Sequence, residues 1–206
     1  MQSLRKRAAQ YHHGDLPRAL RAAAKNLLAE GGAEALTLRE AARLVGVNHR
    51  AVYRHFEDKR ALLAALAEEG FERLTARLQA ALAKHKPQDS TARLLAIGTE
   101  YLAFAQENTA LFGLMFGPRL NEDNRFPWLE KAVAQPLVVL VAEMERGVEH
   151  GRLRPGDPVD RALSLWTLAH GYSELVLQKR IRVRTAALAR RYLRDVLSPL
   201  LAGLSR

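Results

Sequence analysis

Residues 46–56, with the sequence GVNHRAVYRHF, bring four cationic or imidazole side chains into one short segment. These four are His49, Arg50, Arg54 and His55. A guanidinium such as that of Arg50 can donate two parallel hydrogen bonds to the edge of a guanine, and the imidazole of His49 can offer one donor or acceptor. We therefore expect His49 and Arg50 to contact DNA bases.

The neighbouring polar groups are suited to the DNA backbone, because hydroxyl, imidazole, guanidinium and ammonium groups all donate to phosphate oxygens. The candidates for these contacts are Thr37, Tyr53, Arg54, His55 and Lys59. Val47, Val52 and Phe56 would face the protein, which leaves the opposite side of the helix polar. A solvated cationic helix with no ligand is the open alternative at this point.

Local signals predict the elements that position this segment. Asp15, with Pro17 after it, predicts the start of a first helix that ends at Gly31 and Gly32. Residues 37–40, TLRE, have the spacing of a capping box at the start of a second helix. Gly46 then predicts a turn and Asn48 the cap of a third helix, which together form a helix-turn-helix.

The rest of the chain repeats apolar residues every three or four positions, which predicts further helices. We expect one from near Asp58 to about Lys84. Others are predicted at about 91–107, 109–116, 129–149, 158–179 and 184–203. The predicted fold class is all-α, with a helix-turn-helix DNA-binding domain at 1–60 and a helical effector-binding and dimerisation domain at 61–206.

Composition narrows the function classes. The chain has 206 residues, a formal net charge of +10 and no cysteine, and residues 1–60 carry +6 of that charge. The basic Arg5–Arg7 segment is either a solvated tail or an arm that contacts DNA. We expect no membrane span, no metal site, no cofactor and no catalytic residues, and a cytoplasmic location.

Residues 11–66 closely resemble the DNA-binding region of the TetR/AcrR family of transcriptional regulators. The resemblance depends on the Thr37–Glu40 opening of the second helix, on Gly46-Val47, on Tyr53–Phe56 and on Lys59. It implies that the third helix enters the major groove. It also implies that Thr37, Tyr53, His55 and Lys59 hold phosphates. The base-contacting positions vary within the family, so the operator sequence does not follow from His49 and Arg50.

Residues 67–206 resemble the family's C-terminal region, which implies an effector cavity and a homodimer formed by the last two helices. Trp166, His170 and Gly171 resemble the Trp-His-Gly signature of one subgroup. His170 with Glu174 would be short of ligands for a metal, so a hydrogen-bonded His170 is the preferred interpretation. The expected effector pocket consists of Phe104, Leu111, Met115, Phe116, Trp166 and His170.

The resulting hypothesis is a homodimeric DNA-binding regulator, in which a small-molecule effector releases a repressor from a palindromic operator. Two alternatives stay open: a helical enzyme, and a protein that binds anionic membrane surfaces through its basic C-terminal helices. The sequence does not fix the effector, the operator, the target genes or whether the output is repression or activation.

Overall fold

The computed structural model describes residues 15–205. Within that range the chain folds into nine α-helices, together with one isolated β-bridge between Leu153 and Ser205. The helices are α1 Leu16–Ala35, α2 Leu38–Val45, α3 His49–Val52, α4 Lys59–Leu82, α5 Ser90–Glu107, α6 Thr109–Phe116, α7 Pro127–Glu149, α8 Pro158–Leu177 and α9 Ala186–Leu204. The predicted all-α fold class is confirmed. The Arg5–Arg7 segment, His12 and His13 lie outside the described residues.

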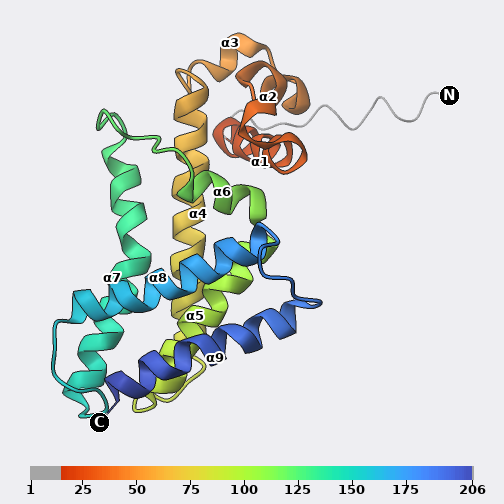
Figure 1. The fold of residues 1–206 in the computed structure, drawn as a ribbon. Coiled ribbons are helices and arrows are strands. Elements are labelled where there is room, and N and C mark those ends of the chain that lie inside the picture. The colour runs from red at the N-terminus through yellow and green to blue at the C-terminus, as the bar shows by residue number, and fades with distance from the viewer. Residues whose placement is uncertain (1–14, 206) are drawn as a thin grey trace.

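Figure 1 shows α1, α2 and α3 gathered at one end of the molecule, with α4 running from that end into the larger C-terminal part. At 1.5 Å per residue, the 24 residues of α4 span about 36 Å. This helix packs against α1, α5, α6 and α7. Helices α8 and α9 pack against each other and against α5. A single rod therefore connects the helix-turn-helix to the C-terminal helices.

The helix caps follow the sequence prediction in part. Thr37 Oγ1 accepts the Glu40 N–H at 3.1 Å, but the Glu40 carboxylate accepts from Arg43 at 2.8 Å rather than completing a capping box. Asp15 was wrongly predicted to cap α1, because its carboxylate forms an ion pair with Arg18 and makes no capping hydrogen bond. The backbone of α1 does break at Gly32 (φ 70°, ψ −174°), and helical backbone resumes after this kink and continues to Ala35.

A buried ion pair fixes the relative positions of α4, α5 and α7. The Arg93 guanidinium forms two hydrogen bonds with the Glu143 carboxylate, at 2.7 and 2.8 Å. It also donates to the carbonyl oxygens of Leu82 and His85, at 2.9 and 3.3 Å, just where α4 ends. Because the last carbonyls of a helix lack partners within the helix, Arg93 both caps α4 and joins α5 to α7.

Candidate DNA-binding surface and effector cavities

The turn between α2 and α3 sets the orientation of the candidate recognition helix. Gly46 adopts the left-handed conformation (φ 76°, ψ 28°), which favours glycine because it has no Cβ. Asn48 then caps α3, since its side-chain oxygen accepts the Arg50 N–H at 2.9 Å. The α-helical segment is only four residues long, and turns continue the chain to His55. Sequence signals therefore located the turn and the cap correctly.

One side of this segment is buried and the other is open. Val52 and Phe56 are buried in the protein core, and Val47 packs against them at its edge. The exposed side chains are His49, Arg50, Tyr53, Arg54 and His55. Tyr53 is 56% exposed, and neither Arg50 nor Arg54 forms an ion pair with any residue between 15 and 205. Two guanidinium groups are thus available to an anion outside the protein.

The two candidate backbone contacts outside residues 49–55, Thr37 and Lys59, each use part of their hydrogen-bonding capacity within the protein. Thr37 is exposed, and its hydroxyl oxygen accepts the Glu40 N–H, so its hydrogen remains free to donate. Lys59 is half-buried and donates one hydrogen bond, of 3.3 Å, to the Glu34 carbonyl oxygen near the end of α1. An ammonium group has three donors, so Lys59 keeps two for another acceptor. Thr37 caps α2 and Lys59 begins α4, and Figure 1 shows the starts of both helices at the end of the molecule that carries α3.

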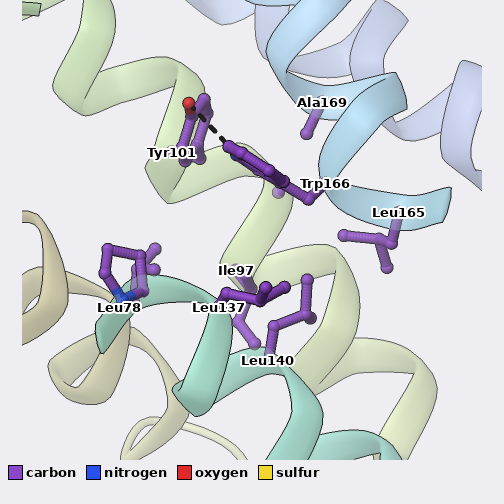
Figure 2. Close-up of a pocket in the computed structure, with 10 residues that line it drawn as sticks. Leu78, Ile97, Tyr101, Leu137, Leu140, Leu165, Trp166 and Ala169 are labelled. Atoms are coloured by element: carbon purple, nitrogen blue, oxygen red, sulfur yellow. Dashed lines mark hydrogen bonds between the residues drawn. The ribbon is translucent and has the colours of Figure 1, made fainter. Parts of the chain in front are cut away.

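The expected effector pocket does not form a single cavity. Trp166 lines a small, largely enclosed cavity among α4, α5, α7 and α8 (Figure 2). Met115 and Phe116 line a separate groove among α4, α6 and α7, and Leu111 faces a third space beside α1. Phe104 is fully buried, with the Arg77 guanidinium 5.8 Å from its ring centre. The rings of Phe116, Trp166 and His170 do pack against one another, at 4.8 to 6.5 Å, so the expected residues form one aromatic cluster beside several separate spaces, and their role in binding an effector stays a prediction.

The enclosed cavity has a volume of about 20 Å³ and is lined mainly by apolar side chains from four helices. That is roughly the room that one water molecule requires. Figure 2 shows the two polar groups near it, the Tyr101 hydroxyl and the Trp166 indole, which are joined by a hydrogen bond of 3.4 Å. This cavity would have to expand before it held an organic effector.

His170 belongs to a hydrogen-bonded aromatic cluster rather than to a metal site. Its Nδ1 lies 2.7 Å from the Tyr101 hydroxyl oxygen, and the rings of Phe112 and Phe116 pack against it at 5.7 and 4.8 Å. The hydroxyl accepts from Trp166, so the arrangement is satisfied when Tyr101 donates to a neutral imidazole. Burial lowers the pKa of His170, which favours that neutral form, although Glu174 opposes the shift. Among residues 15–205, no three His, Asp or Glu side chains are grouped as metal ligands.

The groove among α4, α6 and α7 has a volume of about 260 Å³, which approaches the size of small-molecule sites. Its walls include Phe71, Met115, Phe116 and Leu129, with the start of the α6–α7 loop at its rim. Gly70 allows α6 to approach α4, since a Cβ there would lie 2.6 Å from Met115 Sδ. Sequence reasoning missed Gly70, although a glycine inside a long helix is itself a signal of close packing.

A membrane-spanning segment is absent from the described part of the chain, where no helix is both long and apolar enough to cross a bilayer.

Comparison with known proteins gives the family of this fold. Residues 20–66 match the family described as bacterial regulatory proteins, tetR family, and residues 94–196 match the tetracyclin repressor-like C-terminal domain. Nucleoid occlusion factor SlmA of Edwardsiella ictaluri is 32% identical over 142 residues, which cover 68% of this chain and 69% of that protein. SlmA of Marinobacter nauticus is 30% identical over 137 residues, covering 66% and 68%.

Solved structures agree with this assignment. A Rhodococcus sp. RHA1 protein of unknown function superimposes with a TM-score of 0.82 at 31% identity, covering 96% of this chain and all of that one. A regulatory protein in the tetR family from Rhodococcus RHA1 has a TM-score of 0.65 at 24% identity, covering 90% and 96%, and shares the fold. Membership of the Trp-His-Gly subgroup stays a prediction. The chain belongs to the TetR family of DNA-binding transcriptional regulators, with an N-terminal helix-turn-helix followed by a helical C-terminal domain.

Proposed function

We propose that this protein is a homodimeric repressor that binds a palindromic operator and is released by a small-molecule effector. The observation that carries the proposal is the outward face of residues 49–55, in which cationic and hydrogen-bonding side chains lie opposite buried Val52 and Phe56. A helix of this kind fits the major groove, with one side held by the protein and the other free to contact DNA.

We assign two residues to contacts with base edges and five to contacts with the DNA backbone. Arg50 donates to a guanine and His49 to an adjacent base edge, because both side chains are exposed and project from the start of α3. The backbone contacts come from Thr37, Tyr53, Arg54, His55 and Lys59. We assign DNA binding to residues 1–60, and effector binding and dimerisation to residues 61–206. Helix α4 crosses this boundary and so carries movement from one part to the other.

The dimer is assigned to α8 and α9. Leu168 and Leu175 on α8, and Tyr192 and Val196 on α9, are each between 38% and 43% exposed. Apolar side chains that share two adjacent helices and remain exposed mark a surface for a partner. Leu193 and Leu197 of the same helix are buried and pack within the chain. A second copy bound there would present two recognition helices to one duplex.

The effector acts in the C-terminal domain by favouring a geometry in which the two recognition helices no longer match the operator. It must prefer that geometry by about 1–3 kcal/mol to change the DNA affinity by the factors typical of allosteric proteins.

Selection of bound fragments from the genomic DNA of the source organism tests the function directly. The recovered duplex should bind with an affinity that falls steeply with salt, by about 10³–10⁵-fold between 50 and 200 mM for roughly six to ten phosphate contacts. Failure to recover any preferred sequence would refute sequence-specific regulation. A flat dependence on salt would refute the phosphate contacts.

A further inference from the structure

The loop between α6 and α7, residues 117–126, contacts both the groove and the start of α4. Its first half, residues 117–121, lines the groove together with Met115 and Phe116. Its second half carries Asp123 and Arg125, which pair with residues at the α3–α4 junction. One short loop therefore joins the groove to the segment that follows the recognition helix. Figure 1 shows the course of this loop between α6 and α7.

Arg125 clamps this loop to the α3–α4 junction. Its guanidinium donates to Asp58 Oδ2 at 2.6 Å and to Glu57 Oε2 at 2.7 Å. The other oxygen of Asp58 accepts the Ala61 N–H at 2.8 Å and so caps α4. One carboxylate thus holds both the first turn of α4 and the loop, and the Arg125 hydrogen bond lowers the pKa of Asp58.

The two halves of the loop are tied together inside the protein. Asn121 is buried, and its side-chain oxygen accepts the Phe126 N–H at 2.6 Å while its amide donates to Glu130 at 3.1 Å. The Arg125 guanidinium lies 5.0 Å from the centre of the buried Phe126 ring. A molecule that displaces the groove side of the loop would therefore move Arg125 as well.

We propose that the groove is the effector site, and that its occupation withdraws Arg125 from Glu57 and Asp58 and so shifts α3 relative to α4. This inference rests on the proposed function and adds the place of binding and the route of its signal. Loss of the clamp would free the α3–α4 junction, which holds the recognition helix in the geometry that binds DNA.

The lining of the groove favours an apolar molecule with an anionic or acceptor group at one end. Phe71, Phe116 and Leu129 are among its apolar walls. At the rim, Glu130 Oε1 accepts from Asn121 at 3.1 Å and from Arg119 at 3.5 Å, so the Glu130 carboxylate is paired with a cation. Arg119 makes only a long contact of 3.5 Å there and its side chain is 64% exposed, which leaves donors for a carboxylate.

Decanoate, compared with decyltrimethylammonium, tests the ligand class by isothermal titration calorimetry. Decanoate should bind the full-length protein, and Arg119→Gln should weaken that binding by about fivefold or more, because a charged donor is lost. No decanoate binding, equal binding in Arg119→Gln, or preferential binding of the cation would overturn the assignment of an anionic ligand.

Covalent occupation of the groove tests the coupling without a known effector. The chain has no cysteine, so Val133→Cys can be labelled at one position with benzyl methanethiosulfonate. Val133 lines the groove and is 40% exposed. The matched control is Val138→Cys, a similarly exposed valine of α7 outside the groove lining. Labelling at 133 should weaken binding to the selected duplex by about tenfold or more, and labelling at 138 by less than about twofold.

The clamp is tested by repeating the labelling in two arginine variants. In Arg125→Gln the label at 133 should no longer change DNA affinity, whereas in Arg119→Gln it should still do so. Glu57→Gln removes only an exposed negative charge and leaves the Asp58 cap, so it should reduce the label's effect even if Arg125→Gln folds poorly. An unchanged effect in both Arg125→Gln and Glu57→Gln would overturn the clamp. If the unlabelled protein selects no duplex at all, the proposed function fails instead.

Discussion

Removing the carboxylate of Glu143 should destabilise the protein far more than removing an exposed one. The Arg93 and Glu143 side chains are only 7% and 1% exposed, and two hydrogen bonds join them. Glu143→Gln leaves the Arg93 charge buried without its counter-ion, which typically costs about 3–5 kcal/mol. For a chain of this length each kcal/mol lowers the Tm by about 2–4 °C, so we expect a decrease of roughly 6–20 °C.

Thermal unfolding followed by circular dichroism, at one fixed protein concentration, measures this effect. The matched control is Glu107→Gln, which breaks a 2.6 Å ion pair with Arg77 whose carboxylate is 59% exposed. Exposed ion pairs contribute about 0–1 kcal/mol, so the control should change the Tm by only a few degrees. Equal decreases for the two variants would refute the view that Arg93 and Glu143 lock α4, α5 and α7 together.

Three further predictions concern DNA binding, pH and assembly. Arg50→Ala should relax base preference by about 1–3 kcal/mol at one position of the operator, whereas Lys59→Ala should weaken binding to all duplexes alike; competition binding with single-base operator variants separates the two. Burial lowers the pKa of His170, so the folded protein binds fewer protons there than the unfolded chain. The free energy of unfolding should therefore fall as the pH drops through about 6.5, and wild-type protein should lose more Tm than His170→Gln between about pH 7.5 and about pH 5.5; equal losses would contradict this. Leu168→Glu should convert a dimer to a monomer in sedimentation velocity, and an unchanged dimer would exclude the exposed face of α8 from the interface.

The helix-turn-helix was predictable because its determinants are local. The Gly46 turn, the Asn48 cap and the Thr37 cap each depend on residues within a few positions of one another, so sequence spacing suffices. The helix predicted at about 109–116 matches the limits of α6. Asp15 failed as a cap because its backbone (φ −125°, ψ 22°) does not adopt the extended conformation typical of a capping residue, which residue type alone does not signal.

The region of the proposed effector site was less predictable because its contacts join distant parts of the chain. Arg125 and Asp58 are 67 residues apart, and neither has a neighbour that signals the pairing. The expected pocket grouped large apolar side chains by type, but the crossing of α6 over α4 at Gly70 decides which space each side chain faces. Helix periodicity identifies a buried face without identifying the helix that covers it.

A hydroxyl-radical footprint of the duplex selected from genomic DNA tests the central claim most directly, because it reports how many recognition helices contact one duplex. Two copies of the outward face of residues 49–55 should protect two symmetric half-sites on one side of the duplex, with centres about 34–36 Å apart or a multiple of that distance. Replacing Arg50 should change the same base position in both half-sites. A single protected segment without symmetry would contradict the account. So would an Arg50→Ala variant whose base preference is the same as that of the wild-type protein.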